Sequence, residues 1–205
     1  MGTLLAIDTA APRLQLALLS DTDRLETLVE DMPTGQAERL FPALAELMAR
    51  AGVTYADLTR LAVTTGPGSF TGLRIGLSAA RGLGLALNIP VLGIPSLLAL
   101  SLVARCDAIA VLLDARREEA YFQTFSGPGI PIGQPALLPM TEARARVPRG
   151  AETHTTPYVD IGAMARFAAT AQPDLYPPEA TYIRDADAKP QEKFRVARIA
   201  GDVSA

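Results

Sequence analysis

The chain has 205 residues, of which 49% are hydrophobic and 20% are charged, and its formal net charge is −3. These values are typical of globular proteins and exclude an intrinsically disordered chain. The single cysteine and the single histidine exclude a disulfide framework and any site that needs two imidazole ligands. Because a protein that binds nucleic acid alone usually has a basic surface, the negative charge predicts that RNA is contacted only indirectly, through a partner.

An uncharged stretch over 82–104 is long enough to span a bilayer. However, Asn88, Pro90, Gly93 and Pro95 divide it into the end of a helix, a short strand and the start of a new helix. The N-terminal residues also lack the basic segment of a signal peptide. We therefore expect a cytoplasmic protein that does not enter a membrane.

The spacing of apolar residues predicts the following elements in chain order. Strands are expected over 4–7, 14–18 and 25–29, a helix over 36–51, a strand over 61–65 and a helix over 70–87. A strand over 90–94, a helix over 96–104, strands over 108–113 and 121–125, and a helix over 160–170 follow. The stretch 127–150 is rich in proline and glycine and is expected to contain little regular structure.

Residues 4–19 and 108–125 share one pattern, in which an apolar strand ends in an aspartate and a polar turn leads to a second strand. The aspartates are Asp8 and Asp114, although any strand–Asp–turn–strand hairpin has this pattern. Two such hairpins facing across a cleft describe the actin-like ATPase fold. We therefore expect an α/β protein with two similar lobes, each with a mixed sheet and helices, the second lobe being reduced.

The expected boundaries of these lobes are 1–104 for the N-terminal lobe and 105–205 for the C-terminal lobe, which is shortened near 149–157.

A carboxylate beside free backbone N–H groups can hold a hydrated metal and phosphates. Pro67 removes one donor from the loop over 66–69, and no Walker lysine follows it. A structural strand-to-helix turn is the favoured interpretation. The candidate residues of a vestigial phosphate site are Asp8, Thr9, Gly66, Gly68 and Asp114.

The helices over 36–51 and 70–87 are the candidate interaction surfaces. Each glycine inside a helix costs roughly 1 kcal/mol relative to alanine, so a stripe of small residues implies close approach by another element. The alternative is that both helices merely cover the sheet of their own chain. The predicted interface residues are Leu40, Phe41, Leu44, Leu47, Met48, Gly72, Leu73, Gly76, Leu77, Ala80 and Gly84.

Several segments resemble the TsaB (YeaZ) family, a relative of the TsaD/Kae1 proteins. They are the sequence from Gly66 to Leu100, the triplet Ile7-Asp8-Thr9, LLDARREEAYFQTF in the middle and YIRDADAKPQ near the end. The resemblance implies a role in making N6-threonylcarbamoyladenosine at position 37 of ANN-decoding tRNAs. It implies a non-catalytic scaffold for a TsaD-like subunit, with a TsaE-like ATPase in a larger complex and a homodimer when alone.

The catalytic relatives carry a His-x-x-x-His pair that ligates a metal, and the matching positions here are Ser96 and Leu100. Neither side chain replaces an imidazole, so the resemblance implies no metal site, no cofactor and no enzymatic activity. His154 is expected in an exposed loop. The rival interpretations are an ATP-using small-molecule kinase of the same fold and a metal-dependent endopeptidase.

Overall fold

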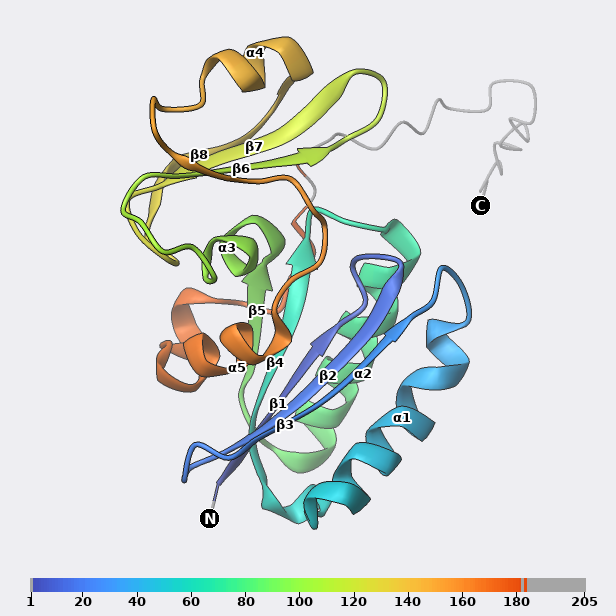
Figure 1. Cartoon of the computed structure of the whole chain (residues 1–205). Coiled ribbons are helices and arrows are strands. Elements are labelled where there is room, and N and C mark those ends of the chain that lie inside the picture. Colours follow the sequence, from blue (N-terminus) through green and yellow to red (C-terminus); the bar gives the residue numbers. More distant parts are fainter. Residues whose placement is uncertain (1, 182, 184–205) are drawn as a thin grey trace, which may run out of the picture.

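Two mixed β-sheets, one in each half of the chain, organise the molecule (Figure 1). The structure is a computed structural model that describes residues 2–181 and 183. Of the segment YIRDADAKPQ, only Ile183 lies within the described residues, and the rest of that predicted resemblance lies outside them. In the described part of the chain, no helix is both long enough and apolar enough to cross a bilayer.

The first sheet has five strands. Its order is β3 (Leu25–Asp31), β2 (Arg13–Ser20), β1 (Thr3–Asp8), β4 (Leu58–Gly66) and β5 (Val91–Pro95). Strands β1, β2 and β3 pair antiparallel, whereas β4 pairs parallel to both β1 and β5. Strand β1 is buried along its whole length because helices cover both faces of the sheet at its centre.

The second sheet repeats this arrangement with four strands in the described residues. Its order is β8 (Pro131–Pro139), β7 (Glu119–Phe125), β6 (Ile109–Asp114) and β9 (Glu152–His154). Strand β6 pairs antiparallel with β7 and parallel with β9, as β1 does with β2 and β4. The prediction of two similar mixed-sheet lobes, the second one reduced, is confirmed.

The expectation of little regular structure over 127–150 is wrong. This stretch contains the edge strand β8 and the helix α4 (Met140–Ala145). Prolines are tolerated in β8 because an edge strand has N–H groups that need no partner. Pairing with β7 therefore overrides the low intrinsic strand propensity of the segment.

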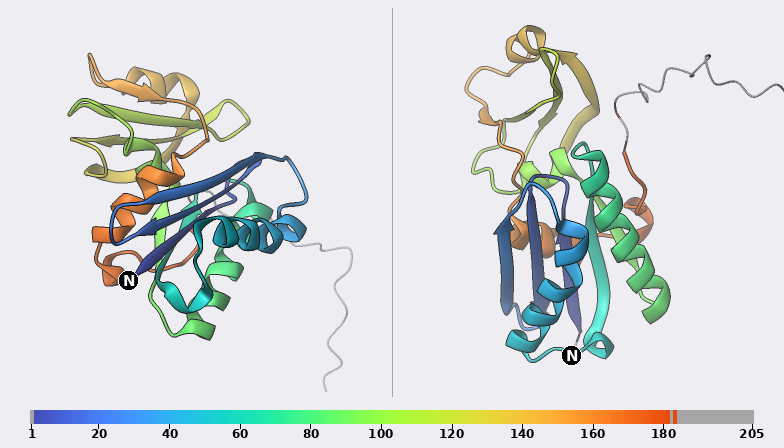
Figure 2. Two further views of the ribbon diagram at one scale, coloured as in Figure 1. Left: turned by 60° about the horizontal axis from the view of Figure 1, so that its bottom comes forward. Right: turned by 90° about the vertical axis from the view of Figure 1, so that its right-hand side faces the viewer.

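The helices lie in layers against the sheets. On one face of the first sheet, α1 (Gln36–Ala51) and α2 (Phe70–Leu87) pack side by side and share an apolar core with it (Figure 2). On the other face, α3 (Ser96–Ser101) and α5 (Ile161–Thr170) share a core with both sheets. Two short 3-10 helices, Tyr55–Asp57 and Pro173–Leu175, complete the described elements.

Helix α5 comes from the second half of the chain but packs against β1 and β2 of the first sheet. Arg60 of β4 fixes its end, since Nη1 donates to the carbonyl oxygens of Ala168 at 2.7 Å, Ala169 at 3.1 Å and Ala171 at 2.9 Å. A cation at a helix C-terminus is favourable because the last carbonyl groups have no partner within the helix. The lobe boundary at 104/105 stays a prediction, and α5, which follows it in the chain, packs on the first sheet.

Replacing Arg60 with alanine should lower the free energy of unfolding by about 1–3 kcal/mol, because three carbonyl groups lose a charged donor. Urea denaturation followed by circular dichroism measures this change. Arg149→Ala, which removes an exposed arginine from the second lobe, is the matched control and should leave the midpoint unchanged. Equal effects of the two substitutions would contradict the role assigned to Arg60.

Candidate functional site

The turn between β1 and β2 is built around Asp8, whose side chain is completely buried. Its Oδ1 accepts hydrogen bonds from the Ala10 N–H at 3.0 Å and from the Thr64 hydroxyl at 2.7 Å. Its Oδ2 accepts a bond of 2.9 Å from Gln15 Nε2, which also donates to the Val159 carbonyl oxygen at 3.1 Å. Both carboxylate oxygens are therefore engaged by the protein.

Burial raises the pKa of the Asp8 carboxyl above its usual value, and the hydrogen bonds from Thr64, Ala10 and Gln15 offset this only in part. Binding a cation requires an ionised carboxylate that the ion can reach. In this fold an ion cannot reach the buried Asp8 carboxyl group, because protein donors occupy both of its oxygens. Its contacts instead connect β1 to β2, to β4 and to the segment before α5.

The loop before α2 lies directly against this turn. A Cβ atom at Gly68 would lie 2.6 Å from the Ala10 carbonyl oxygen, and one at Gly72 would lie 1.9 Å from the Thr9 carbonyl oxygen. Thr9 itself donates from Oγ1 to the Gly72 carbonyl oxygen at 2.7 Å. Gly66 has a φ of +105°, which favours glycine. These glycines are thus explained by close contact between backbone segments.

Asp114 occupies the corresponding position at the end of β6, where it is exposed and its Oδ1 accepts a bond of 2.7 Å from the Arg116 N–H. The fold therefore gathers Asp8, Thr9, Gly66 and Gly68 at the start of α2, and it places Asp114 in the other lobe. No cluster of three or more potential metal ligands exists among residues 2–181 and 183. Phosphate binding at these positions stays a prediction.

The positions that match the His-x-x-x-His pair, Ser96 and Leu100, are both buried in α3. The Ser96 Oγ has no hydrogen-bond partner among the described residues. The expectation that His154 lies in an exposed loop is wrong, because it belongs to β9 and its Nε2 lies 3.1 Å from Oε1 of Glu152. The pairing of β9 with β6 places His154 in the second sheet, far from α3 along the chain.

Most of the residues predicted to form an interface on α1 and α2 are not available to a partner, because they are buried within the chain. All of them except Phe41 are buried against the sheet of their own chain: Leu40, Leu44, Leu47, Met48, Gly72, Leu73, Gly76, Leu77, Ala80 and Gly84. A Cβ at Gly76 would lie 2.6 Å from Thr9 Oγ1, and one at Gly84 would lie 2.2 Å from Val91 Cγ2. The expected close approach is real, but the approaching element is the chain's own sheet and hairpin.

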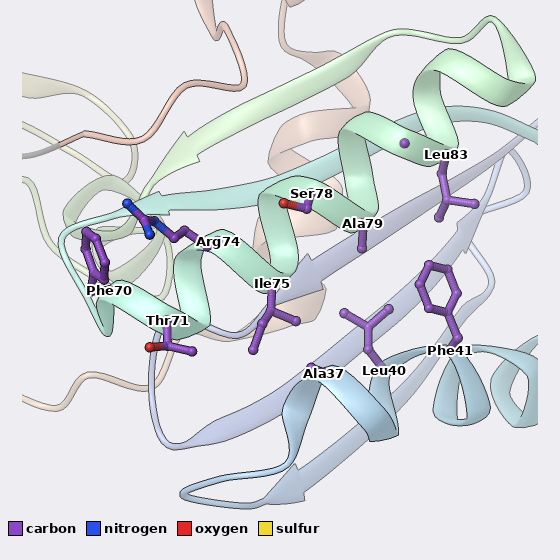
Figure 3. Close-up of a pocket in the computed structure, with 11 residues that line it drawn as sticks. Ala37, Leu40, Phe41, Phe70, Thr71, Arg74, Ile75, Ser78, Ala79 and Leu83 are labelled. Carbon is purple, nitrogen blue, oxygen red and sulfur yellow. The ribbon is translucent and has the colours of Figure 1, made fainter.

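The same two helices enclose a groove of about 650 Å³ between them (Figure 3). We call it the α1–α2 groove. It is lined by Ala37, Leu40, Phe41, Phe70, Thr71, Arg74, Ile75, Ser78, Ala79, Gly82 and Leu83. Phe41 is 47% exposed and Phe70 is 55% exposed, and nearby on α2 the Leu85 side chain is 86% exposed. Large apolar side chains clustered at the surface are typical of protein interaction sites.

Gly82 is one of the residues that line the α1–α2 groove. A Cβ atom there would meet no other atom within 4 Å, in contrast to the glycines of the buried stripe. Ser78, Gly82 and Ala86 are small, lie four residues apart and are exposed. This second stripe was not predicted, although the sequence shows it as small residues that each lie two positions after a member of the predicted stripe.

Comparison with known proteins adds the family. Residues 34–129 match the family model described as TsaD, tRNA N6-adenosine threonylcarbamoyltransferase. An uncharacterized protein of Mycobacterium tuberculosis is 41% identical over 128 residues, which are 61% of this chain and 60% of that protein. The Escherichia coli protein named tRNA threonylcarbamoyladenosine biosynthesis protein TsaB is 34% identical over 126 residues, which are 60% of this chain and 54% of that protein.

Among solved structures, YeaZ from Pseudomonas aeruginosa matches with a TM-score of 0.73 and 26% identity, covering 89% of this chain and 100% of that chain. The chain is therefore similar to the TsaB (YeaZ) family in both sequence and fold. The predicted α/β architecture with two mixed sheets is confirmed, and the YeaZ structures share it. The matches span between about half and three fifths of the curated relatives' length.

Asp8→Asn removes the titrating group of the buried turn. Because the pKa of Asp8 is raised in the folded protein, the folded state binds more protons than the unfolded state between pH 3.8 and the folded pKa. The free energy of unfolding of the wild type, relative to that of the variant, should therefore fall as the pH rises through this window. Urea denaturation at a series of pH values measures the difference.

A difference that instead rises with pH would show that the folded protein stabilises the ionised form of Asp8. That outcome would contradict the structural role and would favour an ion-binding one. Thr22→Ala, an exposed change in the turn between β2 and β3, is the control for effects of pH on the rest of the protein.

Proposed function

We propose that this TsaB-family chain acts in the synthesis of N6-threonylcarbamoyladenosine at position 37 of ANN-decoding tRNAs. In this proposal it is a cytoplasmic, non-catalytic partner of a TsaD-type threonylcarbamoyltransferase. The support for the pathway is the match to proteins named for threonylcarbamoyladenosine biosynthesis in E. coli, Haemophilus influenzae and Bacillus subtilis. The support for a partner role comes from the α1–α2 groove.

Gly82 carries the argument for a partner. A glycine inside an exposed helix costs roughly 1 kcal/mol relative to alanine, and no residue that the structure describes approaches Gly82 closely enough to require it. A stripe of small residues allows the axis of a second helix to come unusually near, because packing distance depends on the side chains at the contact. The exposed rings of Phe41 and Phe70 then provide apolar area for burial.

The non-catalytic role is supported by the side chains at the positions that match the metal ligands of the catalytic relatives. Ser96 and Leu100 stand where the catalytic relatives have imidazoles, and both lie in the core. The carboxylate of Asp8 is fully hydrogen-bonded within the chain. No observation in the described residues specifically favours the kinase alternative or the endopeptidase alternative.

The remaining partners follow from the same surface. We propose that the groove holds a second copy of this chain when the TsaD-type subunit is absent, so that homodimer and heterodimer compete for one face. A TsaE-type ATPase joins the larger complex, and tRNA is contacted only indirectly. The last point is supported by the net charge of −3, since nucleic-acid-binding surfaces are usually basic.

Gly82→Arg tests the docking face. Arginine is a better helix former than glycine and has open space here, so the monomer should be at least as stable as the wild type. The arginine side chain would lie between α2 and the helix of the partner and would add a charge to an apolar contact. We expect affinity for the TsaD-type subunit of the same organism to fall about 30-fold or more, equivalent to roughly 2 kcal/mol.

Isothermal titration calorimetry with the purified subunit measures this effect, and thermal denaturation verifies the stability. Ala145→Arg, at an exposed alanine of α4, is the matched control and should bind like the wild type. Unchanged affinity of the Gly82 variant would refute docking at this face. Robust turnover of a small-molecule substrate by the isolated chain with ATP would refute the scaffold role itself.

A further inference from the structure

The turn between β6 and β7, residues 115–118, has an unusual backbone; we call it the β6–β7 turn. Arg116, Arg117 and Glu118 have φ values of 63°, 53° and 59°. Residues other than glycine rarely adopt this left-handed backbone conformation, because their Cβ crowds the following carbonyl oxygen. No other three successive non-glycine residues in the described chain share it.

The surrounding structure holds this conformation firmly. The Ala115 N–H donates to the Glu119 carbonyl oxygen at 2.9 Å, and the Glu119 N–H donates to the Arg116 carbonyl oxygen at 3.0 Å. The Met140 N–H donates to the Glu118 carbonyl oxygen at 2.7 Å. Glycine at these positions would make the same backbone bonds without the steric penalty. The strained turn therefore gains something from its side chains that glycine would not provide.

The equivalent turn of the first lobe shows what is different. There, residues 9–11 are buried because the loop before α2 and the first turn of that helix pack on them. In the second lobe, β9 leads instead to α5, which packs on the first sheet. The β6–β7 turn consequently lacks a covering helix, and Arg116, Arg117 and Glu118 are exposed.

The charged side chains of the β6–β7 turn indicate which kind of partner it suits. Arg116 forms no ion pair within the described residues, whereas Arg13 and Arg39 each bind a carboxylate of the chain. The sequence from Asp114 to Glu119 contains two arginines and three acids, a net charge of −1, which disfavours a polyanion such as RNA. A guanidinium held in a fixed position suits a single carboxylate on a protein surface.

We propose that the β6–β7 turn is a second contact for the protein that occupies the α1–α2 groove, with Arg116 binding a carboxylate of that partner. Figure 1 shows this turn projecting from the second lobe on the same side as the start of α2, where the groove begins. This inference rests on the proposed function, because it takes the TsaD-type subunit as the partner.

Arg116→Gly provides the sharpest test, because stability and binding should change in opposite directions. Removal of the steric penalty should raise the melting temperature by roughly 2–4 °C. Loss of the guanidinium should weaken binding to the TsaD-type subunit about three- to tenfold at low salt, and Arg116→Glu should weaken it further. Because the contact is electrostatic and lies outside the apolar groove, the difference should shrink as salt is raised.

Calorimetric titration of the TsaD-type subunit at two salt concentrations gives these affinities. Arg149→Glu, an identical charge change at an exposed position just before β9, is the control and should bind like the wild type. If the wild type binds and Arg116→Gly binds equally well at low salt, the second contact is overturned while docking in the groove stands. If the wild type does not bind, both proposals fail. An Arg116 effect on retention of tRNA without an effect on the protein partner also overturns this contact.

Discussion

The closeness of α2 to the first sheet and to the β1–β2 turn is the constraint on which the rest of the structure depends. Gly72, Gly76 and Gly84 leave no room for a side chain between the helix and its own chain. This contact buries Thr9, fixes the loop before the helix and leaves Asp8 enclosed by protein donors. It also sets the rotation of α2, and so decides which residues remain on its outer face.

The rotation of α2 determines which of its side chains are available to a partner. The carboxylate that ends β1 connects strands, as its contacts with Thr64 and Gln15 show. The outer face, in contrast, offers Gly82 with open space above it and phenylalanine rings at its edges. Glycine weakens a helix and exposed rings are poorly hydrated, so covering these features by a partner would be favourable.

The repeated hairpins, their closing aspartates and the helices α1 and α2 could be predicted from the sequence, because each leaves a local pattern. The sequence could not show which neighbour a small residue serves, and the stripe through Gly76 was therefore assigned to a partner although the chain's own hairpin fills it. The placement of α5 on the first sheet and the strand β8 depend on contacts between distant segments, which periodicity does not record. Gly82 was passed over for the same reason, since only the fold distinguishes an open glycine from a packed one.

The most direct test is a structure of this chain bound to the TsaD-type subunit of the same organism. The account predicts a helix of that subunit lying along the α1–α2 groove, with its backbone in van der Waals contact with Gly82 at about 4 Å. The account is contradicted by a complex in which Gly82 and the groove remain open to solvent while the partner binds elsewhere.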